Sequence, residues 1–311
     1  MRSGRAAAAL SGVSVGLADL FNLLISAILL AGIYTTMSIG MTVIYGVMKM
    51  VNLAHAGFMM LGAYFTYELS QRTPIDPLLA AVLAVPVFFL LGIAAYWSMV
   101  RRLPVADVPT LPSLLLLFGL WLVLQNIGYA IWGADDQSIL TPLTMATFRF
   151  SGVTVPVIRL IVFGIAVVSL VLLHLCLTRT WFGRSVRALT QNREAGQLVG
   201  IDTQRTAMLT FGLGIAFTGL AGGLLATLYS FTPDFGGSFM LRSFVIIVLG
   251  GLESFAGVAI GAIIVALIET FSILLVPASY QLAISFALLV VALLILPGGI
   301  EGWLQKRRLA R

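Results

Sequence analysis

The sequence contains two neighbouring polar stretches, Arg179-Thr-Trp-Phe-Gly-Arg-Ser-Val-Arg187 and Asn192-Arg-Glu-Ala-Gly-Gln-Leu-Val-Gly200-Ile-Asp202. They separate two long apolar runs in a chain that has few other polar segments. Positively charged segments between apolar spans are characteristic of the cytoplasmic side of a membrane. We therefore expect residues 179–206 to form a cytoplasmic loop that contacts another protein, although an ordinary positively charged loop would look similar.

The composition places the rest of the chain in lipid. Of its 311 residues, 60% are hydrophobic and 10% are charged, and the mean hydropathy is +1.06. A soluble domain carries roughly 25% charged residues and could not bury so much apolar surface. The net charge of +6 comes from basic residues placed mostly between apolar runs, which indicates membrane topology and argues against nucleic-acid binding.

The apolar runs predict the fold class. A helix needs ~20 apolar residues to cross a bilayer. Two shorter pieces, Met41–Met50 and Leu241–Leu252, each abut a glycine-rich or polar break, which favours broken or re-entrant half-helices. We predict an all-α polytopic membrane protein with about eight transmembrane helices plus one or two half-helices, in one domain over residues 1–311. The expected spans are Leu20–Ile39, His55–Leu69, Leu78–Val100, Leu111–Trp132, Val157–Leu177, Ala207–Phe231, Phe255–Val276 and Tyr280–Leu296.

The charged residues predict the orientation. Arg101-Arg102, the loop 179–206 and the basic tail from Lys306 are expected on the cytoplasmic side, and Asp135-Asp136 and Asp234 outside. If both short pieces are half-spans, both termini are cytoplasmic. Residues 1–16 show no convincing cleavage site and are expected to be retained. The longest outer segment, Gly133–Pro156, is expected to be only a loop.

The sequence lacks the motifs of common enzymes. It contains no Gly-x-x-x-x-Gly-Lys-Ser/Thr loop for nucleotide phosphates and no His-Glu-x-x-His helix. Its two histidines, His55 and His174, and its one cysteine, Cys176, do not form the spacing of a zinc site. We therefore expect no catalytic residues, no metal and no enzymatic activity in this chain.

Polar residues inside apolar runs are the candidates for a solute pathway. His55, with Asn52 before it, begins an apolar helix, where it could bind a solute carboxylate or form a structural hydrogen bond. Glu269 lies within an apolar run, where a carboxylate costs roughly 3 kcal/mol on insertion scales. It must therefore face protein or water and find a donor, either in the pathway or in an interhelical bond.

Two segments suggest an internal repeat. Asn52-Leu-Ala-His-Ala-Gly57 and Leu252-Glu-Ser-Phe-Ala-Gly257 each follow a short apolar piece and precede a helix rich in small residues. Duplicated halves are frequent in transporters, but apolar stretches also resemble one another by chance.

Several sequence motifs follow one another along the chain in a characteristic order and spacing. They include Gly40-Met-Thr-Val-Ile-Tyr-Gly-Val-Met-Lys-Met-Val-Asn-Leu-Ala-His-Ala-Gly57, then Gly183-Arg-Ser-Val-Arg-Ala188, then Gly200-Ile-Asp202, and later Val248-Leu-Gly-Gly251 with Glu269. Together they resemble the permeases of branched-chain amino acid ABC transporters (the LivH/LivM family). The length is similar to the smaller LivH type. After Ala54-His55, however, Ala56-Gly57 replaces the glycine and acidic residue that are common in the family, and Glu253-Ser254 replaces its usual Gly-Ser.

The resemblance implies a permease subunit of an ATP-driven importer for branched-chain or other hydrophobic amino acids, located in the bacterial cytoplasmic (inner) membrane. The implied partners are a second permease (LivM-like, or a second copy), two cytoplasmic ATPase subunits and an extracytoplasmic solute-binding protein. ATP and magnesium would bind in the ATPases, and this chain would hold no cofactor. Relatives that carry urea, short amides or other small polar solutes leave the substrate open.

The resemblance also implies roles for particular residues in an alternating-access mechanism. The expected pathway residues are Asn52, His55, Gly57, Gly251 and Glu269. The residues expected to couple to the ATPases are Gly183, Arg187, Ala188, Arg193, Glu194, Ala195, Leu198, Gly200 and Asp202. The rival hypotheses are a secondary transporter or channel that works alone, for which only Glu269 is a fair ion-coupling carboxylate, and an integral membrane enzyme.

Overall fold

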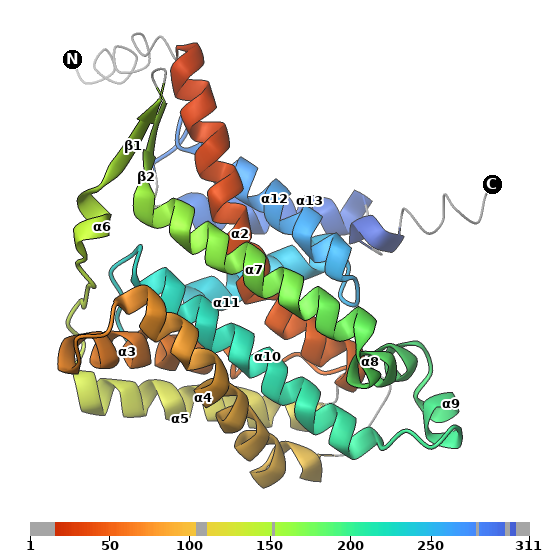
Figure 1. Cartoon of the computed structure of the whole chain (residues 1–311). Coiled ribbons are helices and arrows are strands. Elements are labelled where there is room, and N and C mark those ends of the chain that lie inside the picture. The colour runs from red at the N-terminus through yellow and green to blue at the C-terminus, as the bar shows by residue number, and fades with distance from the viewer. Residues whose placement is uncertain (1–15, 104–110, 151–152, 278–279, 296–298, 303–311) are drawn as a thin grey trace, which may run out of the picture.

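The computed structural model of the chain describes residues 16–103, 111–150, 153–277, 280–295 and 299–302. Long helices dominate it and gather into one bundle (Figure 1). Its elements are α2 (Leu17–Met48), α3 (His55–Arg72), α4 (Pro77–Ser98), η1 (Val100–Arg102), α5 (Leu111–Trp132), α6 (Pro142–Met145), β1 (Thr147–Phe150), β2 (Val153–Pro156), α7 (Val157–Arg179), α8 (Trp181–Gln191), α9 (Arg193–Leu198), α10 (Thr203–Ala226), α11 (Phe235–Gly250), α12 (Phe255–Ser272) and α13 (Gln281–Ile295).

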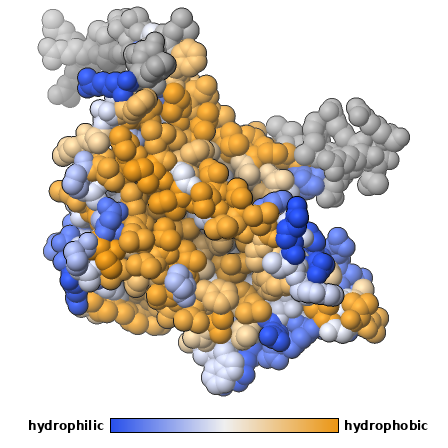
Figure 2. All heavy atoms as spheres, in the orientation of Figure 1, coloured by the Kyte–Doolittle hydropathy of each residue, from blue (hydrophilic) through white to orange (hydrophobic). Residues whose placement is uncertain are grey.

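The all-α membrane fold is confirmed. Each of the eight expected spans corresponds to one helix, namely α2, α3, α4, α5, α7, α10, α12 or α13. Within the described ranges, seven helices are long and apolar enough to cross a membrane, and α3 is not among them. Figure 2 shows an apolar surface over the middle of the molecule and hydrophilic residues at the lower right, where α8 and α9 lie. This distribution is the one that a lipid-embedded bundle requires.

The expected half-helix at Met41–Met50 is wrong. These residues form the end of α2, one continuous helix of 32 residues. Gly40 and Gly46 lie inside this helix without breaking it. Their lack of a side chain lets neighbouring elements approach the helix closely. A Cβ atom on Gly40 would lie 2.6 Å from the carbonyl oxygen of Gly214, and one on Gly46 would lie 3.4 Å from Thr190. The helix ends only at Lys49, whose backbone adopts φ 52°.

The second short piece, Leu241–Leu252, does fall in a short element. It lies mostly in α11, an apolar helix of 16 residues that ends at Gly251. The backbone of Gly251 has φ 111°, which favours glycine, and the chain then turns into α12. Of the two expected interruptions, the one after Leu241 is therefore present, as the end of α11 at the glycine pair Gly250-Gly251.

The segment Gly133–Pro156 is more than the loop that we expected. It contains the short helix α6 and an antiparallel hairpin in which Phe148 pairs with Val155 and Arg149 with Thr154. The three consecutive β-branched residues Val153-Thr-Val155 favour an extended strand. The hairpin also contacts α2, since the side-chain oxygen of Asn22 accepts a hydrogen bond from the backbone nitrogen of Thr154 at 2.9 Å.

Glycines on α10 bring the centre of the bundle together. A Cβ atom on Gly222 would lie 2.0 Å from the carbonyl oxygen of Met59 on α3, and one on Gly219 would lie 2.3 Å from the Phe88 ring on α4. Helix backbones can approach this closely only where side chains are absent. These α10 glycines therefore allow α10 to pack tightly against α3 and α4.

The two ends of the bundle are distinguished by the elements that lie there. The hairpin and the first turns of α2 share one end, and the last turns of α2 reach α8 at the other. The prediction of a cytoplasmic N-terminus depended on a half-span at Met41–Met50 that α2 does not contain. Residues 1–15 themselves, and the basic tail from Lys306, lie outside the described residues.

Candidate solute pathway and coupling surface

Two cavities lined by described residues enter the bundle. The first, with a volume of about 530 Å³, lies toward the hairpin and is called here the hairpin-side cavity; its lining includes Tyr34, Arg159, Tyr229, Arg242 and Glu269. The second, of about 1110 Å³, is called the α8-side cavity. Its lining includes Ile39, His174, Arg187, Gly251 and Glu253.

The two cavities line up along the same helices. Each has lining residues from α2, α7, α11, α12 and α13, with the hairpin-side residues at one end of each helix and the α8-side residues toward the other. On α2, the nearest lining residues of the two cavities are Tyr34 and Ile39. Five residues of helix correspond to about 7.5 Å. A short segment of α2 therefore separates two cavities that lie toward opposite ends.

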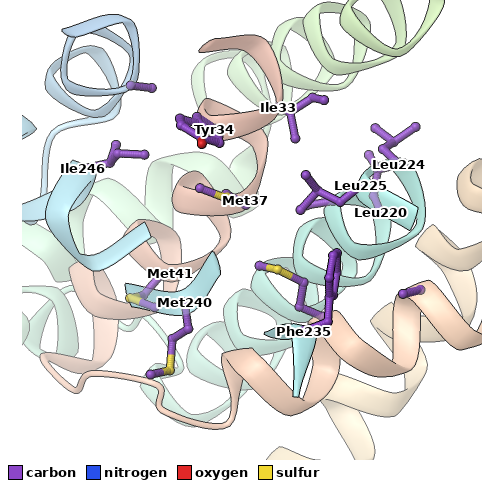
Figure 3. Close-up of a cluster of buried hydrophobic side chains, with 14 of the residues drawn as sticks. Ile33, Tyr34, Met37, Met41, Leu220, Leu224, Leu225, Phe235, Met240 and Ile246 are labelled. Atoms are coloured by element: carbon purple, nitrogen blue, oxygen red, sulfur yellow. The ribbon is translucent and has the colours of Figure 1, made fainter. Parts of the chain in front are cut away.

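The barrier between the cavities is buried and contains hydroxyl-bearing as well as apolar side chains. The four α2 residues from Thr35 to Ser38 are each at most 5% exposed. Figure 3 shows Tyr34, Met37 and Met41 following one another along α2, with Ile246 of α11 among the buried side chains near them. On α11, Ser243 is fully buried between Arg242 of one cavity and Phe244 of the other.

Glu269 is the centre of a polar network at the deep end of the hairpin-side cavity. Its Oε1 accepts a hydrogen bond from Nε of Arg242 at 3.0 Å and another from the Ser285 hydroxyl, while Oε2 accepts one from the Tyr34 hydroxyl. The donors come from α11, α13 and α2, so the carboxylate on α12 joins four helices. The side chain of Glu269 is 5% exposed, and that of Arg242 is 15% exposed.

The partners of Glu269 were not predicted from the sequence. Arg242 lies inside the apolar piece Leu241–Leu252, and its charge there was the available signal. A cation in an apolar helix and a carboxylate in another must each find a partner, and the simplest solution is to pair them. Tyr34 and Ser285 carried no comparable signal, because hydroxyl groups occur commonly along apolar helices.

His55 and Asn52 are fully buried but line neither of these cavities. Nδ1 of His55 lies 3.0 Å from the Thr218 hydroxyl oxygen, and that hydroxyl also contacts the carbonyl oxygen of Gly214 at 2.8 Å. Because the single hydroxyl proton goes to the carbonyl, His55 donates through Nδ1. This bond joins α3 to α10, as the structural interpretation of His55 requires. Within the described residues, Nε2 of His55 and both side-chain polar atoms of Asn52 have no partner.

The five expected pathway residues are therefore not brought into one site. Glu269 lines the hairpin-side cavity and Gly251 lines the α8-side cavity. Gly57 packs α3 against α5, since a Cβ atom there would lie 2.9 Å from Leu124. Only Glu269 and Gly251 adjoin the hollows through which a solute could move, and they do so at different ends.

The second candidate surface is formed by α8 and α9. In α8, Gly183, Val186 and Leu189 are buried, whereas Arg184 and Arg187 are exposed. Burial of every third residue is the pattern of an amphipathic helix that lies on the bundle. A Cβ atom on Gly183 would meet the backbone of Leu177 at 2.2 Å, so glycine at this position lets α8 turn closely under α7.

Side-chain caps hold the short helix α9 and the turn that follows it. The side-chain oxygen of Asn192 accepts a hydrogen bond from the backbone nitrogen of Ala195 at 2.9 Å, and Asp202 caps α10 through the nitrogen of Arg205 at 2.9 Å. Such bonds satisfy amide groups that a helix start leaves free. Gly200, between the two helices, has φ 84°. The expected residues Asn192 to Asp202 thus form one ordered projection.

The tip of this projection exposes apolar side chains. Leu198 is 89% exposed and Val199 is 76% exposed, although Glu194 and Gln197 around them are polar and exposed. Of the other residues expected to couple, Ala195 is exposed, and Arg193 and Ala188 are half-buried. Large apolar groups at the tip of a polar projection favour contact with another protein.

Among the described residues, no group of three or more His, Cys, Asp and Glu side chains is arranged to hold a metal. A bundle of membrane-spanning helices, with two cavities along the same helices and a buried barrier between them, defines a membrane transport protein. The chain belongs to the family described as the permease component of the branched-chain amino acid transport system, whose family model matches residues 5–293.

Curated relatives agree with this family. The chain is 28% identical to the high-affinity branched-chain amino acid transport system permease protein LivH of Salmonella typhimurium, over 88% of this chain and 92% of the relative. It is 26% identical to the corresponding BraD protein of Pseudomonas aeruginosa, over 90% and 94%. A ribose import permease of Bacillus subtilis is 29% identical over 47% of this chain and 46% of its own length. No solved structure matches the chain significantly.

Proposed function

We propose that this chain is the membrane-spanning subunit of an ATP-driven (ABC) importer that carries branched-chain or other hydrophobic amino acids. The observation that carries the proposal is the pair of cavities, one lined by Tyr34 and the other by Ile39, with the buried residues 35–38 of α2 between them. Alternating access requires a barrier that can open to one side at a time. A tilt of α2 against α11 would enlarge one cavity as it narrows the other.

The energy for this movement would come from partner subunits. We propose that α8 and α9 face the cytoplasm and that Leu198 and Val199 insert into a groove of an ATPase subunit. Exposed Glu194 and Arg187 would make contacts at the rim, where charges set orientation more than affinity. Because α8 packs against both α7 and α2, a displacement of the projection would reach helices that line both cavities.

The complete transporter would hold two permease subunits, two ATPases and a solute-binding protein on the outer side. The second permease would be a LivM-like chain or a second copy of this one. The α8 end and the end of α13 would face the cytoplasm of a bacterium, and the hairpin would face the binding protein. ATP and magnesium would bind only in the ATPase subunits.

Reconstitution of the whole transporter tests this proposal. Proteoliposomes would contain this chain, its second permease and its ATPases, with the binding protein and labelled leucine outside. Leucine uptake should require ATP on the ATPase side and should stop when hydrolysis is blocked. Uptake that proceeds at the same rate without ATP would contradict the proposal and favour a transporter that works alone.

A second candidate solute class comes from the partial match to the ribose import permease. Labelled ribose, urea and leucine should therefore be compared in the same vesicles. If ribose or urea is taken up and leucine is not, the proposed ATP-driven mechanism would stand, but the proposed solute class would be wrong.

A further inference from the structure

We propose that Arg242 in the hairpin-side cavity binds the carboxylate group of the transported solute, and that Glu269, Tyr34 and Ser285 hold its guanidinium group in position. This inference rests on the proposed amino acid importer and adds a binding group to it.

The hydrogen bonding of Arg242 leaves one side of its guanidinium group available. Only Nε donates a hydrogen bond, to Oε1 of Glu269. No described residue accepts a hydrogen bond from its two terminal nitrogens, and the side chain lines the cavity at 15% exposure. A guanidinium group carries five N–H donors in a planar fork that can bind a carboxylate through two parallel hydrogen bonds. The edge near Nε is therefore held by protein, while the terminal donors of this cavity-lining residue have no acceptor among the described residues.

The guanidinium group is fixed by several helices. Its central carbon lies 5.2 Å from the centre of the Phe239 ring, a cation–π contact one turn earlier on α11. Glu269 is held in turn by the hydroxyl groups of Tyr34 and Ser285. Buried ion pairs add little net stability, because the cost of desolvation offsets the attraction. The network of hydrogen-bonded side chains around Glu269 is therefore better explained as a means of positioning Arg242 than as a contribution to the stability of the fold.

The charge of the cavity suits an anionic group. Glu269 balances Arg242, and a second arginine, Arg159, also lines the cavity. Arg159 is exposed and forms no ion pair with a described residue, so the three charged lining residues carry a net charge of +1. A positive charge at the entrance raises the local concentration of a carboxylate.

The rest of the lining suits an aliphatic side chain. Leu29, Leu30, Ile33, Leu228 and Phe239 supply an apolar wall beside the arginine. The volume of about 530 Å³ lies within the range of small-molecule sites, roughly 300–1,000 Å³. An amphipathic solute with a carboxylate at one end and a branched hydrocarbon at the other would satisfy both parts. A sugar has no group that requires the free donors of Arg242.

Ligand-dependent thermal unfolding of the purified full-length chain in detergent tests the inference without the partner subunits. Leucine, leucinamide and 4-methylpentanoate would be titrated separately into the high millimolar range, because a ligand that binds the folded state raises the unfolding temperature. Leucine and 4-methylpentanoate, which carry the carboxylate, should stabilise the chain. Leucinamide, which lacks it, should not. Equal stabilisation by leucine and leucinamide, or none by either carboxylate, would overturn the inference.

Variants then assign the effect to Arg242. Arg242→Gln alone leaves Glu269 without its cation, so the double variant Arg242→Gln with Glu269→Gln removes both charges together and protects the fold. The double variant should bind leucine at least about ten-fold more weakly, whereas Arg242→Lys should retain part of the affinity, because lysine keeps the charge without the fork. The matched control is Arg149→Gln, an exposed arginine of the hairpin that does not line the cavity.

If a folded double variant binds leucine as tightly as the original chain, the proposed role of Arg242 is wrong. This result would not contradict the proposal that the transporter imports leucine. Conversely, ATP-driven uptake of a solute without a carboxylate, with no leucine uptake, would overturn both this inference and the proposed solute class. Transport and binding assays together thus distinguish the two failures.

Discussion

Nζ of Lys49 lies 2.5 Å from Oε1 of Glu253, and this ion pair joins the end of α2 to the turn between α11 and α12. Glu253 belongs to one of the two segments whose sequences suggested an internal repeat, and Lys49 lies three residues before the other. Their side chains are 26% and 46% exposed, so solvent screens the attraction. The pair connects the two turns that precede α3 and α12.

We predict that this ion pair contributes less than about 1 kcal/mol to stability. Lys49→Asn is the suitable variant, because asparagine tolerates the left-handed backbone at this position better than most residues. It would be combined with Glu253→Gln in a double-mutant cycle measured by thermal unfolding. A coupling energy well above 1 kcal/mol would show that the turn is more rigid and less solvated than its exposure indicates.

Gly200→Ala should weaken the attachment of the ATPase. A residue with a side chain at φ 84° costs roughly 1–2 kcal/mol, and no atom lies within 4 Å of the position of the new Cβ, so the cost is confined to the backbone. The turn between α9 and α10 should shift while the bundle stays folded, and less ATPase should copurify. The matched control is Gly119→Ala on α5, which also has open space but a helical backbone. Equal copurification for both variants would contradict the prediction.

Replacing Leu198 and Val199 with serine should leave the unfolding temperature of the chain unchanged, because both side chains are exposed in the isolated structure. ATPase copurification should fall about ten-fold or more, as expected when a central apolar contact is lost. Met145→Ser controls for the removal of an exposed apolar group, since Met145 is 82% exposed on α6 near the hairpin. Normal ATPase binding by the Leu198 and Val199 variant would exclude this tip as the contact.

Glu269→Gln should lower stability by about 3 kcal/mol or more, because Arg242 would keep a mostly buried charge without a counterion. Tyr34→Phe removes one of the three donors to Glu269 and should cost about 1 kcal/mol. Thermal unfolding and the yield of folded protein would compare the two. Equal costs would show that the ion pair is less important than the hydroxyl bond.

Gly222→Ala should prevent α3 and α10 from packing, because the new Cβ would lie 2.0 Å from the carbonyl oxygen of Met59. The backbone of α3 cannot move away without disturbing its other contacts, so we expect a loss of folded protein. Gly164→Ala on α7 meets no atom within 4 Å and should be neutral. Size-exclusion chromatography of both variants in detergent would measure the fraction of folded protein.

The helical fold and the projection between α7 and α10 could be predicted from the sequence. Apolar length predicted eight helices, because a bilayer imposes a minimum span on each. The helix starts at Asn192 and Asp202 and the turn at Gly200 agree with the conformational preferences of these residue types. These features depend on local chemistry, which a sequence displays directly.

Other features depend on contacts between distant segments. The break expected near Met41 is absent, and Gly40 instead packs against the backbone of Gly214, which is far away in sequence. Likewise, the sequence showed Glu269 and Arg242 as separate polar residues, and only the packing of α11 against α12 brings them together. The assignment of Gly57 to a pathway was likewise open until its contact with Leu124 was known.

The unbroken course of α2 has a mechanical consequence. Its 32 residues correspond to about 48 Å, longer than the roughly 30 Å of a hydrocarbon core, so one continuous helix can cross the core and extend beyond it. Residues between Leu23 and Tyr34 border one cavity, Ile39 borders the other, and no break interrupts the helix between them. Because the helix is continuous, a displacement of its backbone near Gly46 should also displace Tyr34, with no other element needed to transmit the movement.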